Sequence, residues 1–181
     1  MISITIPAGE LYDFSKEEFI VIKDHTLLLE HSLVSIAKWE SKWEKPFLGD
    51  EKKTKTEIID YIRCMTITQN VDPVVYNFIT DQNIEDVSKY IEAPMTATWF
   101  SEKNTGPVIN KEVVTAEIIY YWMITFNIPV EFQKWHLNRL LTLIKVCSIK
   151  NAPKEKMRKS EILSKYKALN QARKAKLHTN G

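Results

Sequence analysis

Glycine and cysteine are both scarce in this 181-residue chain, which contains four glycines and two cysteines. With so few glycines, few positions can adopt a positive φ without strain, which argues against an all-β barrel or sandwich and its many tight turns. Two cysteines are too few for the disulfide framework of a small secreted protein. Because Cys64 and Cys147 both lie in apolar, helix-like runs, we expect them to be free and buried.

Long apolar segments are also missing from the sequence. No apolar run approaches the roughly 18 residues that a membrane-spanning helix needs. Residues 1–7 lack the basic start and the apolar core of a secretory signal peptide. We therefore expect a protein of the cytoplasm that makes no contact with a membrane.

The short motifs of common catalytic and metal sites do not occur either. The two glycine-rich phosphate-binding patterns, GxGxxG and GxxxxGK(S/T), are both absent from the sequence. The histidines and cysteines show none of the local spacings typical of zinc sites. Glu40 and Glu44 are four residues apart, but lysines alternate with them, which is typical of a solvated, charged helix face. The sequence thus predicts no catalytic residues, no metal and no cofactor, and we expect the protein not to be an enzyme.

The N-terminal 31 residues carry strand patterns. Isoleucine alternates with serine and threonine over residues 2–6, which predicts a half-buried strand. Residues 18–23 are rich in β-branched and aromatic side chains, and residues 26–31 are a third candidate. Because so few strands are only marginally stable alone, this small β element should pack against helices.

Helix signals dominate the rest of the chain. N-capping residues followed by apolar residues at helical spacing predict helices over 32–43, 56–67, 73–79, 81–92, 116–126, 129–147 and 160–177. The expected caps are Ser32, Thr56, Asp72, Thr80, Thr115 and Ser160, and Pro129 is the expected first residue of its helix. Residues 116–126 are apolar almost all round, so this helix should be central and buried. The expected fold is mainly α: a helical, bundle-like single domain over residues 1–150 with the small β element, followed by a C-terminal arm over 151–181.

Charge is distributed unevenly along the chain. The net charge is +2, but residues 151–181 hold nine basic and two acidic side chains, so the arm carries +7 and the remainder carries −5. Apolar residues recur near helical spacing in the arm, which predicts a basic amphipathic helix. Two interpretations stay open: the arm binds nucleic acid through phosphate contacts, or it docks on a protein such as an acidic neighbouring subunit. Tyr166 is its only aromatic residue, so no base-stacking platform is evident.

Two tryptophans form the other distinctive pattern. Trp39 and Trp43 lie four residues apart, so they share one helix face, either in the core or in a groove that binds a partner. His136 and Arg139, beside an apolar stripe, are more typical of structural residues. The candidate partner-binding residues are Trp39, Trp43, Lys154, Arg158, Lys159, Lys165, Tyr166, Leu169, Arg173 and Lys174.

Four segments resemble a known family. HSLVSIAKWESKW at 31–43, IEAPMT at 91–96, QKWHLNRL at 133–140 and the ending 169–181 resemble small proteins of phages and prophages of low-GC Gram-positive bacteria. The resemblance covers nearly the full length and points to the tail-gene region, and hence to tail assembly chaperones. These are helical proteins that coat the tape-measure protein while the tail tube polymerises.

The resemblance implies a non-enzymatic morphogenesis protein that binds the tape-measure protein in the host cytoplasm. Two alternatives remain. The first is a virion component, such as a head–tail connector or minor tail protein that contacts tail or neck subunits. The second is a nucleic-acid-binding or anti-defence protein. A homo-oligomer is compatible with each of them.

Overall fold

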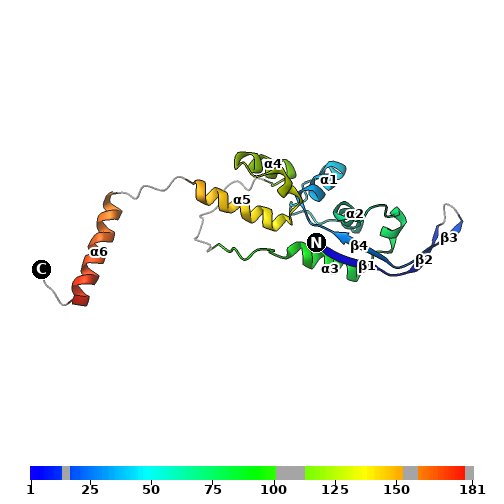
Figure 1. Ribbon diagram of the computed structural model, residues 1–181, viewed down its shortest axis with the longest axis horizontal. Helices are drawn as coiled ribbons and strands as arrows, with labels where there is room; N and C mark the ends of the chain where they lie inside the picture. The colour runs from blue at the N-terminus through cyan, green and yellow to red at the C-terminus, as the bar shows by residue number, and fades with distance from the viewer. Residues whose placement is uncertain (14–16, 101–112, 153–158, 178–181) are drawn as a thin grey trace. The chain divides into compact units, whose positions relative to one another are not determined.

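The chain is mainly helical and begins with a small β element, as the sequence predicts (Figure 1). The computed structural model describes residues 1–13, 17–100, 113–152 and 159–177. Two compact units are present, residues 1–148 and residues 149–181. Among the described residues, no helix is both long enough and apolar enough to cross a membrane.

The β element is one long hairpin that is interrupted in the middle. Strand β1 (Ile2–Ile6) pairs antiparallel with β4 (His25–Leu29), and β2 (Gly9–Asp13) pairs antiparallel with β3 (Glu18–Ile22). The residue numbers of each pair add to the same value in both ladders, so the two ribbons share one register. Between them, the carboxylate of Asp24 accepts a hydrogen bond from the amide of Ala8 at 2.6 Å. Strand β2 was not predicted from the sequence.

The inner ribbon, β1–β4, provides one wall of the core. Alternate side chains point inward, and these are the buried residues Ile4, Ile6, Leu27 and Leu29. Ser3 and Thr5 lie on the solvent side, so the period-two pattern read from the sequence corresponds to the observed faces.

Helices α1 (Leu33–Trp43) and α2 (Lys55–Met65) pack against each other and form the centre of the first unit. Ser32 caps α1, as predicted, and the helix ends at Glu44, whose φ of 53° is left-handed. The predicted N-cap of α2 was wrong by two residues. The cap is Thr54, which forms a reciprocal pair of hydrogen bonds with Glu57.

The next segment follows the predicted caps. Asp72 caps a short 3₁₀ helix, η1 (Pro73–Phe78), and Thr80 caps α3 (Asp81–Glu92). Helix α3 packs against β1, where the side-chain amide of Asn83 donates to the carbonyl of Thr5 at 3.2 Å.

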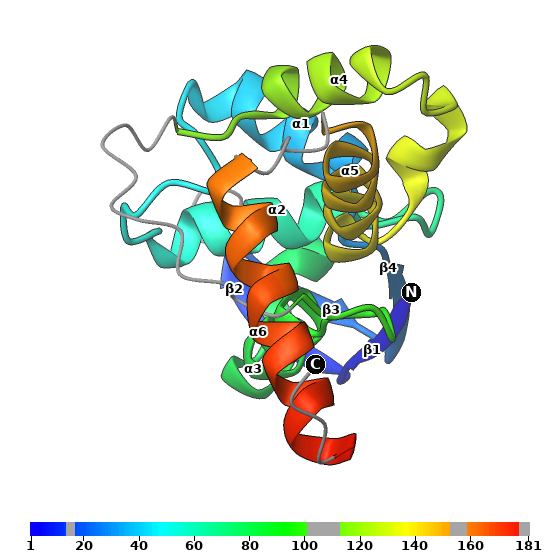
Figure 2. The ribbon, with the colours of Figure 1, turned by 90° about the vertical axis from the view of Figure 1, so that its left-hand side faces the viewer.

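Helix α4 (Ala116–Thr125) lies beside α1 (Figure 2). The prediction that this helix is central and buried all round was wrong. Ala116, Ile119 and Met123 are its buried residues, whereas Ile124 is 75% exposed. The sequence overstated the burial because α4 is covered on one side only.

The predicted continuous helix from Pro129 to Cys147 was also wrong. Residues Val130–Lys134 form a 3₁₀ helix, η2, and α5 starts only at Leu137 and extends to Asn151. Tertiary pairing causes the break, because the amide of Leu137 donates to the carbonyl of His31 at 2.8 Å and residues 32 and 136 form a β-bridge.

The second unit contains the helix α6 (Lys159–Leu177). Its described apolar side chains Leu163, Tyr166, Leu169 and Leu177 fall within about 120° of the helix circumference. Arg173 falls inside the same sector, so the apolar stripe is interrupted by a positive charge.

Candidate partner-binding surfaces

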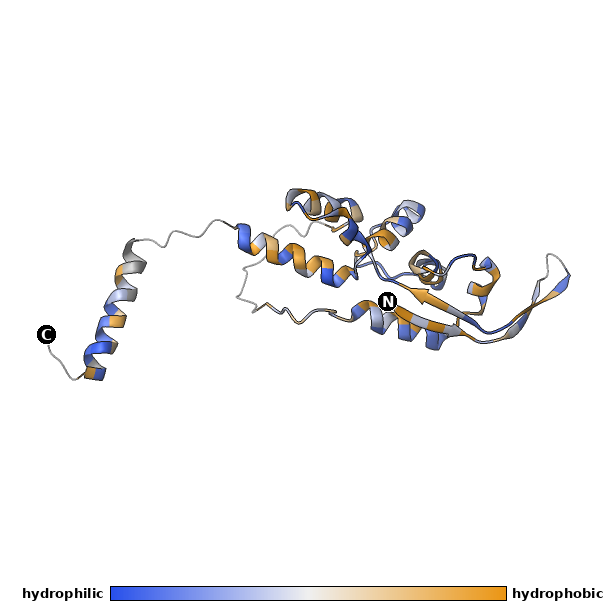
Figure 3. Ribbon diagram, in the orientation of Figure 1, coloured by the Kyte–Doolittle hydropathy of each residue, from blue (hydrophilic) through white to orange (hydrophobic). Residues whose placement is uncertain are grey.

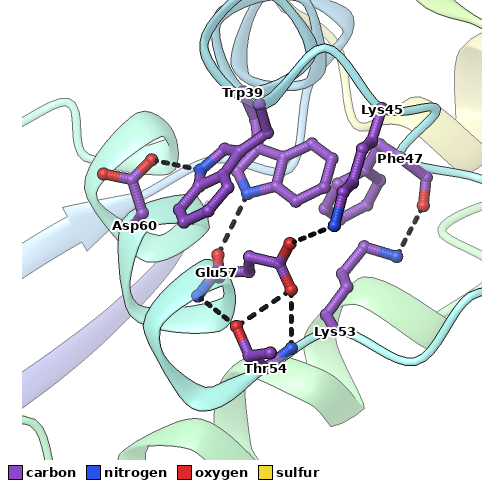
Figure 4. A network of polar contacts seen from close by, with 8 residues as sticks. Trp39, Lys45, Phe47, Lys53, Thr54, Glu57 and Asp60 are labelled. Atoms are coloured by element: carbon purple, nitrogen blue, oxygen red, sulfur yellow. Dashed lines mark hydrogen bonds and ion pairs between the residues drawn. The ribbon is translucent and has the colours of Figure 1, made fainter.

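The tryptophan pair holds α1 against α2 (Figure 4). Trp39 is 1% exposed, and its indole N–H donates to the carbonyl of Glu57 at 3.0 Å. Trp43 is half-buried and donates to Oδ2 of Asp60 at 2.9 Å. The two rings stack with centroids 6.1 Å apart. Of the two interpretations of this pair, burial in the core is the one that Trp39 fits, and no partner can reach its ring.

Charged groups surround this contact and satisfy one another. Nζ of Lys45 lies 3.1 Å from Oε1 of Glu57, and Lys42 forms an ion pair with Asp60. The backbone amide of Thr54 and then the ammonium of Lys45 hold the pKa of the Glu57 carboxyl at about 2. Burial lowers the pKa of Lys53, which donates to the carbonyl of Phe47 at 2.7 Å (Figure 4). This network fastens the two helices and the loop between them.

Glu40 does not lie on a solvated face, so that prediction was wrong. Its carboxylate is buried, and it accepts from the amide of Phe47 at 2.7 Å and from the amide of Ala116 at 2.8 Å. Ala116 is the first residue of α4, and the predicted cap, Thr115, makes no side-chain capping bond. Glu40 therefore satisfies the N-terminus of α4 from a distant helix, where a negative charge is favoured.

A second buried polar cluster joins His31 and His136, whose ring centroids are 5.1 Å apart. Nδ1 of His31 lies 2.5 Å from the hydroxyl of Tyr61, and Nε2 of His136 lies 3.1 Å from the carbonyl of Tyr90. Burial, and then the neighbouring His136, lower the pKa of His31 to about 3. Burial also lowers the pKa of His136 and raises that of the Tyr61 hydroxyl. Both imidazoles are neutral at pH 7 and inaccessible to a substrate.

Arg139 packs on an aromatic ring. Its guanidinium lies 4.1 Å from the ring centroid of Trp135, a cation–π contact, and no acidic partner is seen for it among the described residues. Its neighbour Asn138 donates to the carbonyls of Ile91 and Ala93 at 2.9 and 2.8 Å.

The thiols and the other possible ligands do not assemble into a metal site in the described part of the chain, where no group of three or more His, Cys, Asp or Glu side chains could hold an ion. Cys64 and Cys147 are free and half-buried. Burial raises the pKa of the Cys64 thiol, which keeps it protonated and unreactive at neutral pH.

An apolar groove of the first unit lies between α4 and α5. Two adjoining hollows of about 520 and 380 Å³ share Trp122 from α4 and Leu141 from α5. The first hollow extends to Asp50, and the second extends to Lys145 and Ser148. The other lining residues are Leu48, Gly49, Val113, Val114, Phe126 and Ile144. Below we call this surface the α4–α5 groove.

The α4–α5 groove was not predicted from the sequence. Figure 3 shows apolar residues along both helices, and the aromatic residues of 116–126 were the available signal. That signal was assigned to a buried core. The walls come from three distant segments, around residues 48, 122 and 141, and no local pattern indicates that they meet.

The ten residues selected from the sequence are divided between the two units. Tyr166, Leu169, Arg173 and Lys174 are exposed on α6 in the second unit, whereas Trp39 and Trp43 belong to the first. Of Lys159 and Lys165 the structure describes the backbone alone, and Lys154 and Arg158 lie outside the described residues.

Comparison of the chain with protein-family models, with curated proteins and with solved structures found no significant match.

Proposed function

We propose that this protein is a non-enzymatic phage morphogenesis factor, a tail assembly chaperone that holds an apolar helical segment of the tape-measure protein in the α4–α5 groove. The observation that carries the proposal is the groove itself, in which Trp122 and Leu141 line both of two adjoining hollows. Amphipathic helices bind proteins by laying an apolar face into grooves of this kind.

The charged residues that line the groove indicate which charges a bound segment should carry. Asp50 lies at one end and Lys145 at the other, with Trp122 and Leu141 between them. A helix with apolar residues at helical spacing, a basic residue near the Asp50 end and an acidic residue near the Lys145 end is complementary to it. The phage assignment comes from the family resemblance. In this proposal the helices of the first unit pack as a bundle, and the basic C-terminal helix is amphipathic.

Co-expression with the tape-measure protein of the same phage tests the proposal. We expect the tape-measure protein to stay soluble and to co-purify with this chain. Ser148→Arg places a bulky charged side chain at the edge of the groove without removing a core residue, and it should weaken the complex by about tenfold or more. Ser41→Arg, at an exposed position of α1, is the matched control and should leave binding unchanged.

Mass spectrometry of purified particles separates the chaperone from the virion-component alternative. A chaperone is released before the particle matures, so we expect no peptides of this chain in particles. Stoichiometric peptides in the particle would refute the chaperone function. A tape-measure complex that Ser148→Arg and Ser41→Arg leave equally intact would refute the proposed role of the groove.

A further inference from the structure

The outer ribbon β2–β3 presents apolar side chains that the first unit does not cover. Phe19 is 66% exposed and Val21 is 70% exposed, and Leu11 on the other face is also exposed. At the base of the ribbon, Gly9 lies so close to Phe78 of η1 that an added Cβ would be 3.0 Å from its ring, which anchors the hairpin where β1 and β4 end. The exposed apolar residues lie beyond that anchor, toward the turn.

This apolar ribbon is also acidic. Residues 9–24 contain five acidic and two basic side chains, a net charge of −3. Glu10 and Glu18 are exposed. They lie on opposite faces of the ribbon, because Glu10 is on β2 and Glu18 pairs with Asp13, three residues further along the same strand. An exposed surface that combines apolar side chains with one sign of charge indicates a partner of the opposite sign.

Helix α6 has the complementary properties. Residues 159–177 contain six basic and one acidic side chain, a net charge of +5. Leu163, Tyr166 and Leu169 are exposed along one side, and Lys167 and Lys174, seven residues apart, lie together along one edge of that side. A lone helix of this length is only marginally stable in water, so α6 needs a surface to pack against.

We propose that α6 of one copy docks on the β2–β3 ribbon of a second copy, so that copies of this chain associate head to tail. Leu163, Tyr166 and Leu169 would cover Phe19 and Val21 on one face of the ribbon, while Lys167 and Lys174 approach Glu10 on that face and the net negative charge of the ribbon. The interface joins two different surfaces, so each added copy leaves one ribbon and one α6 open. Such association continues into short chains of molecules unless it closes into a ring.

The proposal goes beyond the chaperone function and does not depend on it, because it concerns the β2–β3 ribbon and not the α4–α5 groove. Its first test is sedimentation velocity of the purified full-length protein over a range of concentrations. We expect the mass to rise with concentration in about 50 mM NaCl and to fall toward the monomer in about 500 mM NaCl, where surface charges are screened over a few ångströms. A monomer at every concentration overturns the proposal and indicates that α6 binds its own chain or another partner.

Charge reversal on each surface gives the decisive test. One variant carries Glu10→Lys and Glu18→Lys on the ribbon, and the other carries Lys167→Glu and Lys174→Glu on α6. Each variant alone places like charges at the proposed contacts between the ribbon carboxylates and the two lysines of α6, so we expect its association to weaken by about tenfold or more. An equimolar mixture restores opposite charges across the interface, and we expect association to return.

The matched control for the ribbon variant is Glu51→Lys with Glu92→Lys, which makes the same change in net charge as that variant at exposed positions outside the ribbon and α6. Association of the control should equal that of the wild type, and circular dichroism should show that all variants are folded. Failure of the mixture to associate, or an equal loss in the control, overturns the proposal. A second outcome would also overturn the proposal. In it, the wild-type protein, freed of nucleic acid, is monomeric but binds DNA, and Lys167→Glu with Lys174→Glu abolishes the DNA binding.

Discussion

At the scale of single residues, Glu40 has the largest structural role that the sequence did not reveal. One carboxylate satisfies the amide of Phe47, in the loop after α1, and the amide of Ala116, at the start of α4. Both amides are shielded from water, so removing their acceptor leaves two buried donors without a partner. The residue was interpreted as part of a charged surface because lysines lie beside it in sequence, and those lysines occupy other faces of α1.

We expect Glu40→Ala to lower the free energy of unfolding by about 3 kcal/mol, because each unsatisfied buried donor costs roughly 1–3 kcal/mol. Urea denaturation followed by tryptophan fluorescence measures the change. Glu92→Ala, at an exposed position at the end of α3, is the control and should change stability by less than about 0.5 kcal/mol. Equal stabilities of the two variants would show that Glu40 is not the cap of α4.

At the scale of elements, local capping accounts for most of the helix starts. Ser32, Asp72 and Thr80 were identified as caps from the sequence, and each accepts the expected backbone hydrogen bond. For α2 the predicted cap, Thr56, lies inside the helix. The observed cap is Thr54, because Glu57, three residues later, completes the reciprocal pair.

Thr54→Ala should therefore destabilise the protein by about 1 kcal/mol, the usual cost of losing a capping side chain. Thr56→Ala, two residues later on the exposed side of the first turn, should change stability by a few tenths of a kcal/mol at most. The two variants are compared by thermal and urea denaturation under identical conditions. The reverse order of stabilities would mean that the helix begins at Thr56 in solution.

Features that depend on distant segments could not be predicted. The break between η2 and α5 exists because residues 136 and 137 pair with 31 and 32. Strand β2 lacks the alternation of β1, and its pairing with β3 specifies it. The α4–α5 groove has the same origin, since Leu48 and Leu141 become neighbours only after folding. Local signals therefore predicted most of the elements, whereas tertiary contacts specify β2, separate η2 from α5 and determine where the candidate site lies.

At the scale of the whole molecule, the buried polar clusters make stability depend on pH. The folded-state pKa of His31 is about 3, compared with 6.5 for an ordinary histidine, and that of Glu57 is about 2, compared with 4.5. Both values are lowered on folding, so the unfolded chain binds protons more readily than the folded protein. Each group contributes stability that is complete above its ordinary pKa and is lost as the pH falls toward its folded value.

We expect the free energy of unfolding to decrease first between about pH 6.5 and 3, through His31, and further between about pH 4.5 and 2, through Glu57. The variant His31→Asn removes the first titration, so its stability should be lower at pH 7 but should depend less on pH between 6.5 and 4.5. Urea denaturation at a series of pH values measures both effects. His25→Asn, a substitution in β4 outside the cluster, should keep the wild-type slope, and a wild-type slope in His31→Asn would contradict the assignment.

The shared register of the two β ribbons constrains how this protein can change in evolution. Residues 7 and 8 on one side and 23 and 24 on the other separate the ribbons by equal lengths, so the inner and outer ladders stay in phase. An insertion of one residue in a single connection would move the side chains of one outer strand to the opposite face of the ribbon, or it would force a bulge. Homologous hairpins of different reach should therefore have gained or lost residues in matched pairs, one on each side of the ribbon.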